Sequence, residues 1–385
     1  MHIYLDNAAT TRIDPEVLQS MLPYMTDLCG NPSSLHRYGC RAKVALENAR
    51  KKIAHLVHAA PAEIVFTSGG TEGNNMLLQG IIAAMHIRHV LTSPLEHMAV
   101  RMPLECLAKQ GIVQLTYAPI NQRGELCLDY VKMWLKNNRN ALVSFMRVNH
   151  EIGNITDVCA IGQLCQTYGA FFHSDTVQSL YCLEHDFSQL PIHLALGSAH
   201  KIHGPKGVGF AYIHPKASVA PLLHGGSQEL NRRGGTENVP SIMGMATALE
   251  IAVRDRAQTA THLQSIKKYM IEALQQQIPM VRFNGTSAHE TQSSPTVLNV
   301  SFPHCPDRDM LVYNLDIHGI AASTGSACTS GSNTGSQVVS ALQTGESHAI
   351  RFSFSKYTTQ AEIEQTAAQL ATLCNEKSGG SMRSE

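Results

Sequence analysis

The stretch LALGSAHKIHGPKGVGFAYI, residues 194–213, holds two short apolar runs on either side of a basic, glycine-containing loop. We expect Leu194–Ser198 and Gly207–Ile213 to be two strands of one sheet, because each run is apolar and bounded by turn residues. The second run begins too soon after the first for a helical crossover. The stretch therefore predicts an antiparallel strand pair with a lysine, Lys201, in the loop between its strands.

Upstream, similar apolar runs alternate with helical stretches. They are Ile64–Thr67, Val90–Ser93, Val113–Ala118, Leu142–Val148 and Ala170–Asp175. The ends of most of these runs lie about 25–30 residues apart, which is the spacing of strand–helix units in a parallel sheet. We therefore predict an α/β domain with a mixed sheet of about seven strands flanked by helices.

Downstream of the lysine loop the pattern becomes helical and then mixed. A long helix near Val239–Gln277 is predicted to bridge two domains, because its apolar residues recur three and four positions apart. Beyond it we expect a strand, a helix, a second strand and an amphipathic helix at Thr296–Phe302, Arg308–Leu315, Ala349–Ser355 and Gln360–Cys374. The predicted domains are a large α/β domain over residues 13–255, a small α+β domain from residues 1–12 and 256–377, and a flexible tail, 378–385.

Composition narrows the class of protein. The chain of 385 residues has 30 Lys+Arg and 30 Asp+Glu, so its net charge gives no reason to expect nucleic acid or a membrane as partner. Its ten cysteines are scattered singly, so we expect them to be reduced. No Cys/His cluster offers four ligands, and no metal site is predicted. The sequence shows neither a signal peptide nor an apolar stretch long enough to span a bilayer, so we expect a cytoplasmic protein.

The loop SAHKIHGPKG, residues 198–207, is the first candidate functional site. It joins two strands, and ligands of open α/β sheets bind at strand ends. A lysine there can hold an aldehyde cofactor as a Schiff base, with Ser198 and His200 near enough to bond a phosphate. The alternative interpretation of Lys201 is an ordinary basic turn at the surface.

Three further features favour a cofactor. Asp175 ends a predicted strand, where a carboxylate can keep a pyridinium nitrogen protonated. Gln178 follows three residues later and could reach a phenolic oxygen of the same ring. The segment Thr67–Asn74, TSGGTEGN, opens a helix, so Gly70 and Thr71 can offer backbone N–H groups and a hydroxyl to a phosphate. Each feature also has an ordinary interpretation: a helix cap, an exposed amide, a plain turn.

A series of motifs runs in order along nearly the whole chain, from Tyr4 to about Ala371. They are YLDNAATT (4–11), GNPSSLH (30–36), FTSGGTEGNN (66–75), EHMAV (96–100), EIGN (151–154), SDTVQ (174–178), SAHKIHGPKG (198–207), GGSQELNRRGGTEN (225–238), STGSACTSG (323–331) and IRFSFS (350–355). With them the chain resembles the NifS/IscS-like cysteine desulfurases, a branch of the class-V aminotransferase group of pyridoxal-phosphate (PLP) enzymes. The resemblance implies the PLP-dependent transferase fold, aspartate aminotransferase-like and of fold type I, with PLP bound by the large domain.

The resemblance also implies roles toward the cofactor. Lys201 would carry PLP and then move the α-proton of the substrate, while His97 would stack on the ring and act in acid–base steps. Asp175 and Gln178 would bond the ring nitrogen and the phenolic oxygen. The implied phosphate-binding residues are Gly70, Thr71, Ser198, His200 and, from a neighbouring subunit, Thr236. A homodimer is therefore expected.

Toward the substrate, the resemblance implies that Cys328 is the catalytic sulfur acceptor and that Arg351 and Asn7 bind L-cysteine. The planar fork of an arginine suits a carboxylate. Cys328 stands among small residues, a setting more typical of a reactive loop than of a core. The implied reaction converts L-cysteine to L-alanine and leaves a persulfide on Cys328. Its sulfur would pass to an acceptor protein in iron–sulfur cluster assembly or tRNA thiolation.

The sequence departs from the family pattern at His150. The family has Asn-Asn-Glu where this chain has Asn149-His150-Glu151, so His150 takes the place expected to bond the phenolic oxygen of PLP. Histidine can donate a similar bond, but its protonation varies near neutral pH, unlike that of an amide. This difference predicts a pH-sensitive cofactor absorption band.

Other interpretations stay open from the sequence. Without the resemblance, His97 is equally a partly buried histidine, and Arg351 a partner of a surface carboxylate. Among related activities, a selenocysteine lyase or another class-V aminotransferase competes, and Cys328 separates them because transamination does not need it. A non-catalytic sulfur-transfer scaffold is a further alternative, disfavoured by the joint presence of Lys201, Asp175, Arg351 and Cys328.

Overall fold

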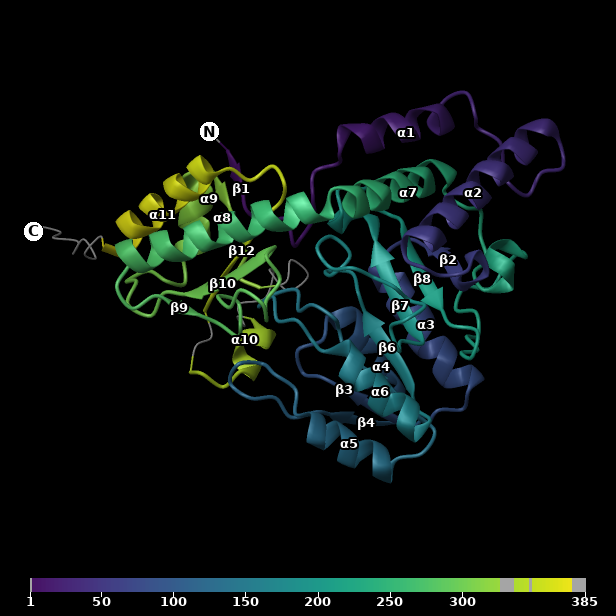
Figure 1. Ribbon diagram of the computed structural model, residues 1–385, viewed down its shortest axis with the longest axis horizontal. Helices are drawn as coiled ribbons and strands as arrows, with labels where there is room; N and C mark the ends of the chain where they lie inside the picture. Colours follow the sequence, from purple (N-terminus) through teal and green to yellow (C-terminus); the bar gives the residue numbers. More distant parts are fainter. Residues whose placement is uncertain (1, 326–335, 346–347, 376–385) are drawn as a thin grey trace, which may run out of the picture.

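The computed structural model describes residues 2–325, 336–345 and 348–375, which form two lobes (Figure 1). The larger lobe is built on a seven-stranded sheet. Its strands are β2 (Ile64–Thr67), β3 (His89–Thr92), β4 (Gln114–Tyr117), β5 (Ala141–Ser144), β6 (Phe171–Asp175), β7 (Leu194–Ser198) and β8 (Gly209–Ile213). Their spatial order is β2-β8-β7-β6-β5-β3-β4.

The sheet is mixed because β8 runs against its two neighbours. Leu194 pairs with Ile213 and Ser198 with Gly209 in the antiparallel ladder between β7 and β8. The ladders from β7 through β6, β5 and β3 to β4 are all parallel. The predicted α/β class, the mixed sheet and the antiparallel pair around the lysine loop are therefore confirmed.

Helices cover both faces of the sheet, since successive residues of each strand point to opposite sides. On one face, Val65 and Leu196 pack with apolar residues of α3 (Gly70–Ala84) and α4 (Met98–Lys109). On the other, Phe66 and Ala195 pack in the main core. The helices on that side are α2 (Arg37–Leu56), α5 (Leu128–Asn137), α6 (Val158–Tyr168) and α7 (Val239–Arg254). Outside them, α1 (Pro15–Met25) packs against α7.

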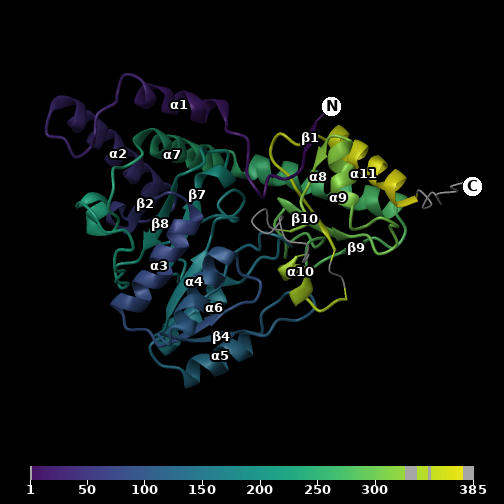
Figure 2. The same ribbon diagram turned by 180° about the vertical axis from the view of Figure 1, so that it is seen from behind.

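The smaller lobe combines short strands with helices. Its strands are β9 (Arg282–Phe283), β10 (Val297–Ser301) and β12 (Ile350–Ser353), which form an antiparallel sheet in the order β12-β10-β9, and β1 (Ile3–Tyr4), which pairs parallel with β11 (Ile320–Ala321). Its helices are α8 (Arg256–Gln277), α9 (Leu311–Ile317), α10 (Gln337–Ala341) and α11 (Gln360–Asn375). Both views show β1 in the same lobe as α11, the last described helix (Figures 1 and 2).

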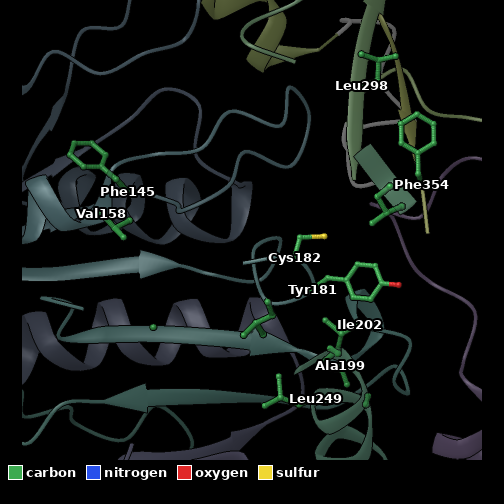
Figure 3. Packing of buried hydrophobic residues seen from close by; sticks show 14 of the residues in the cluster. Phe145, Val158, Tyr181, Cys182, Ala199, Ile202, Leu249, Leu298 and Phe354 are labelled. Atoms are coloured by element: carbon green, nitrogen blue, oxygen red, sulfur yellow. The ribbon is translucent and has the colours of Figure 1, made fainter. Parts of the chain in front are cut away.

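One apolar core joins the lobes. Leu249, Tyr181 and Ile202 from the larger lobe belong to the same buried cluster as Leu298 and Phe354 from the smaller one (Figure 3). Three short 3-10 turns complete the described elements: η1 (Pro61–Glu63), η2 (Ala199–Lys201) and η3 (Gln228–Asn231). Among the described helices, none combines the length and the apolar character that a membrane crossing requires.

Most predicted elements differ from the observed ones by a residue or two at their ends, and the larger differences are the following. The single helix expected over Val239–Gln277 is two helices, because the chain breaks at Asp255, which leaves helical geometry at the end of α7. The strand expected over Leu142–Val148 ends at Ser144, although Phe145, Met146 and Val148 stay buried. The helix expected from Arg308 begins at Leu311. The second difference arises because the residues after Ser144 are buried but do not pair with a neighbouring strand. An apolar run in the sequence does not distinguish a strand from a buried loop.

Candidate active site

A cavity of about 170 Å³ lies where β6 and β7 end, between the first turn of α3 and the N-terminal segment of the chain. This is the carboxyl edge of the parallel strands, where ligands of α/β sheets bind. The predicted site residues that line it are Gly70, Thr71, His97, His150, Asp175, Gln178, Ser198, His200, Lys201 and Arg351. The structure thus brings together ten residues that are scattered in sequence between Gly70 and Arg351.

Lys201 is held in the cavity by the N-terminal segment. It ends the turn η2, which follows directly on β7. Its Nζ donates hydrogen bonds to the carbonyl oxygens of Ala8 at 2.5 Å and Ala9 at 2.8 Å. The amide Nε2 of Gln178 donates to the same Ala8 carbonyl at 3.1 Å. The lysine is therefore directed inward rather than lying in a surface turn.

Asp175 is fixed by two hydrogen bonds. Its Oδ2 accepts from Nδ2 of Asn74 at 2.8 Å, and its Oδ1 accepts from the backbone N–H of Val177 at 3.0 Å. Asn74 lies on α3 and is buried. Sequence reasoning missed this residue. A signal existed in its position, four residues after Gly70 and therefore on the same side of the helix.

In the glycine turn before α3, the backbone of Gly69 and Gly70 faces the loop after β7, and neither residue has a side chain that would cover it. Gly69 has φ +144° and ψ −171°, a conformation in which glycine is favoured. A Cβ at Gly69 would lie 3.6 Å from Oγ of Ser198, and one at Gly70 would lie 3.2 Å from Val177. Because the first N–H groups of a helix lack partners within it, this turn is suited to an anion.

His200 adds a neutral imidazole to the same corner. Its Nδ1 lies 3.2 Å from Oγ1 of Thr10, and burial with the nearby Lys201 and Lys206 charges lowers the pKa of His200 to about 4. Ser198 is buried beside it at the end of β7. Hydroxyl, imidazole and backbone donors thus converge on one end of the cavity.

Two histidine rings face each other over the cavity. The His97 and His150 centroids are 5.1 Å apart, with the ring planes at 76°. Nδ1 of His97 accepts a hydrogen bond from the backbone N–H of Ala99, so the neutral ring carries its proton on Nε2. Burial, reinforced by His150, lowers the pKa of His97 to about 4. His97 is therefore a neutral, oriented imidazole at pH 7.

Arg351 reaches the cavity from β12 in the smaller lobe. It is only 1% exposed, and its guanidinium donates to Oδ1 of Asp6 at 2.8 Å and to the carbonyl of His150 at 3.0 Å. The carboxylate partner foreseen as an alternative exists, yet the arginine is buried rather than at the surface. Asn7, which does not line the cavity, donates from Nδ2 to the carbonyl of Ser353 at 2.9 Å.

Two predicted residues are not placed in this cavity. Thr236 is exposed and does not line it within the one chain. Cys328 lies outside the described residues. In the described ranges, no group of three or more His, Cys, Asp or Glu side chains is arranged to hold a metal ion.

The donor set fits a phosphorylated pyridine aldehyde. Among described residues, three buried polar atoms of side chains that line the cavity have no hydrogen-bond partner: Oδ1 of Asn74, Nδ1 of His150 and Nε of Arg351. Buried polar atoms normally have partners, so such atoms indicate a bound polar ligand. An amine, a fixed carboxylate and a glycine-lined helix start complete the requirements of that ligand.

Comparison with known proteins gives consistent matches over most of the chain. Residues 3–366 match the family described as aminotransferase class-V. The chain is 38% identical to the cysteine desulfurase IscS of Dictyoglomus turgidum, covering 94% of this chain and 92% of that protein. It is also 38% identical to the putative cysteine desulfurase IscS 1 of Bacillus subtilis, covering 96% and 98%.

Solved structures agree. A NifS-like protein superposes with a TM-score of 0.88 at 32% identity, covering 97% of this chain and 99% of the other. A NifS-like protein from Rickettsia africae superposes with a TM-score of 0.86 at 27% identity, again covering 97% and 99%.

Proposed function

Because this chain belongs to the class-V aminotransferase family and, within it, to the cysteine desulfurases, we propose that it removes sulfur from L-cysteine and releases L-alanine, with PLP as cofactor. The observation that carries the proposal is that Lys201, Asp175 and Arg351 line one cavity although they come from three different elements, η2, β6 and β12. An amine, a carboxylate and a guanidinium are the groups that an amino-acid reaction on an aldehyde cofactor requires.

Bound PLP would supply a protonated pyridine ring that withdraws electrons from the substrate Cα. Lys201 would hold the cofactor through Nζ. Asp175 would keep the ring nitrogen protonated, because its carboxylate is already fixed by Asn74 and the N–H of Val177. The phosphate would lie at the turn of Gly70 and Thr71, with Ser198 and His200 as further donors.

Arg351 would bind the carboxylate of L-cysteine. Its Nε has no hydrogen-bond partner among the described residues, whereas its two terminal nitrogens already contact Asp6 and the His150 carbonyl. These contacts fix the plane of the guanidinium before substrate arrives, so little side-chain freedom is lost on binding.

Proton transfer falls to two side chains. The Lys201 amine, once released from the cofactor, would take the α-proton of the substrate. His97 would be the second group, because its neutral ring holds a proton on Nε2 and its low pKa keeps it from binding another at neutral pH. The side-chain hydrogen bond from the Ala99 backbone keeps this tautomer in place.

Cys328 would accept the sulfur. Its thiolate forms a sulfur–sulfur bond with the sulfur of L-cysteine while the Cβ–S bond of the substrate breaks. The Cβ atom gains a proton and the product leaves as L-alanine. The atoms and charges balance without an external oxidant or reductant, because one thiolate is converted into one persulfide anion.

The proposal also covers the oligomeric state of the protein and the acceptor that receives the sulfur. Thr236 is exposed and away from the cavity of its own chain, which supports a homodimer in which it reaches the phosphate of the other subunit. The sulfur would then pass to an acceptor protein of iron–sulfur cluster assembly or tRNA thiolation in the cytoplasm. Co-purification followed by transfer of labelled persulfide sulfur would test each acceptor.

The central experiment measures L-alanine and sulfide released from L-cysteine with a reductant, for wild type and for Cys328→Ala. Release by the wild type alone would support the proposed desulfurase. Equal release by both proteins would contradict it and favour a lyase or an aminotransferase. Purified protein without a visible cofactor absorption band would instead favour a non-catalytic scaffold.

A further inference from the structure

Behind the cavity, the turn that carries His150 also carries a buried carboxylate. Glu151 is 3% exposed, and its Oε1 lies 3.4 Å from Nε2 of His150. Its other oxygen, Oε2, accepts a hydrogen bond from Oγ of Ser336. One carboxylate therefore contacts a ring of the active site with one oxygen and a distant part of the chain with the other.

Ser336 is the first described residue after the segment 326–335, which contains Cys328. It caps α10, because its Oγ accepts from the backbone N–H of Val339 at 3.0 Å. At the other end, Gly325 is the last described residue before the segment. A Cβ there would lie 3.4 Å from Oε2 of Glu151 and 3.5 Å from Cβ of Ser336. One end of the segment is therefore bonded to the Glu151 carboxylate through Ser336, and the other end, at Gly325, lies beside it.

Apolar packing stabilises the contact between the turn of Glu151 and α10. Val339 and Leu342, from α10 and its end, are buried in one cluster with Leu95 and Ile152. Ile152 follows Glu151 directly, so the turn and the helix share a core. The turn itself is held by Asn149, whose Oδ1 accepts from the backbone N–H groups of Glu151 and Ile152 at 2.9 Å each.

The charge of Glu151 is also supported. Burial acts to raise the pKa of Glu151, but the hydrogen bonds from His150 and Ser336 and the charge of Arg351 outweigh it and lower the pKa. The carboxylate is therefore ionised at neutral pH. An ionised acceptor makes the stronger kind of hydrogen bond, so the contact with Ser336 is suited to holding the chain in place.

We propose that Glu151 is a positioning residue for sulfur transfer: its carboxylate fixes the imidazole of His150 with one oxygen and, with the other, Ser336 at the end of the Cys328-containing segment. The proposal rests on the proposed function, because it assigns to Glu151 the placement of the sulfur acceptor relative to the cavity. Glu151 itself does not line the cavity.

The test compares L-alanine formation by Glu151→Ala, Glu151→Gln and Ser336→Ala with that of wild type. We expect kcat to fall by about 10- to 100-fold in Glu151→Ala, because misplacement of a reacting group by about 1 Å costs that much. KM for L-cysteine should stay within twofold of wild type. Glu250→Gln, which changes an exposed carboxylate paired with Lys52, is the matched control and should leave kcat and KM unchanged.

Variants of Ser336 distinguish the effect of its bond to Glu151 from the effect of its role as the N-cap of α10. Ser336→Thr keeps the hydroxyl and should restore most of the rate. Ser336→Asp keeps a good N-cap but sets a second carboxylate against Glu151, so it should be as slow as Ser336→Ala. The double variant Glu151→Ala/Ser336→Ala should be no slower than the slower single variant, because both remove one contact. Rate losses that multiply, or a kcat of Glu151→Ala within twofold of wild type, would overturn the proposal.

A measurement made without substrate distinguishes the proposed role of Glu151 from the proposed desulfurase function. In Glu151→Ala we expect alkylation of Cys328 by iodoacetamide, followed by mass spectrometry, to be several-fold faster than in wild type, with Cys106 as an internal exposed reference. A wild type that forms no L-alanine, together with this change in alkylation, would reject the proposed function and retain the role of Glu151. Unchanged alkylation would reject the role of Glu151.

Discussion

Nδ2 of Asn74 donates a 2.8 Å hydrogen bond to Oδ2 of Asp175 across the boundary between α3 and the sheet. Asn74 is 1% exposed, and Asp175 is buried as well. The helix that begins at the glycine turn therefore also fixes the carboxylate proposed to bond the cofactor ring. The two ends of a bound PLP, its phosphate and its ring nitrogen, would depend on one helix.

Replacement of Asn74 by alanine is expected to weaken PLP binding by at least about tenfold. The reason is that Asp175 would lose a buried hydrogen bond to a charged group, which contributes about 1.5–3 kcal/mol. The measurement is a titration of the cofactor-free protein with PLP, followed by absorbance. Asn75→Ala is the control, because the hydrogen bonds of Asn75 within the described part of the chain join it to the Thr71 carbonyl and to Gln79 on the same helix. Equal affinities of both variants would contradict the prediction.

Arg351→Lys is expected to raise KM for L-cysteine by about 10- to 100-fold. A lysine lacks the planar fork and leaves Asp6 or the His150 carbonyl without its donor, and breaking a buried charge pair costs about 3–5 kcal/mol of stability. Steady-state kinetics and thermal unfolding check both effects. Arg308→Lys, at a half-exposed position, should change neither. An unchanged KM would show that substrate carboxylate binds elsewhere.

His150→Asn is expected to remove pH dependence from the cofactor absorption band. In wild type the band should depend on pH, because an imidazole next to the cofactor can gain or lose a proton whereas an amide cannot. The ring of His150 lines the cavity, and its Nδ1 has no hydrogen-bond partner among the described residues. Spectra of both proteins over a range of pH test the idea, which fails if the wild-type spectrum is constant.

Stability is expected to fall as pH decreases from about 6.5 to 4. Burial lowers the pKa of His173 and His203 to about 4 in the folded chain, whereas an unfolded histidine titrates near 6.5. The unfolded state therefore binds protons first as pH falls, and the free energy of unfolding decreases across this window. Urea midpoints at several pH values measure it. His203→Gln should flatten the dependence, and exposed His289→Gln should not; identical slopes in all three proteins would refute the explanation.

Much of the fold could be predicted because its strands are short and buried. Ile64–Thr67 and Leu194–Ser198 begin and end as expected, since turn residues or glycines bound each apolar run. Boundaries that depend on tertiary contacts were harder to predict from the sequence. Asp255 interrupts a continuous helical periodicity, and Ser144 ends a strand within an apolar stretch, because ladder partners rather than composition decide where pairing stops.

The candidate site shows the same division. Lys201, Asp175 and Gly70 have distinctive positions next to strand ends, and the structure places all three in one cavity. Asn74 has only a weaker signal, its position four residues after Gly70, and Glu151 has none. Their importance comes from partners far away in sequence, Asp175 and Ser336, and a contact over 100 or more residues leaves no local pattern in one sequence.

The N-terminal segment has a consequence for the synthesis of this protein. The backbone of Asp6 forms an isolated parallel β-bridge with Ser353, and the hydroxyl of Ser353 accepts a hydrogen bond from the N–H of Ala8. The carbonyl of Ala8 in turn accepts a hydrogen bond from Lys201. A ribosome adding about 5–20 residues per second would release these partners roughly 17–70 s apart. Residues 6–8 must therefore wait, without these partners, until Ser353 has been synthesised. A nascent chain can form the large sheet early, but the contacts that hold Lys201 are completed only after synthesis has passed Ser353.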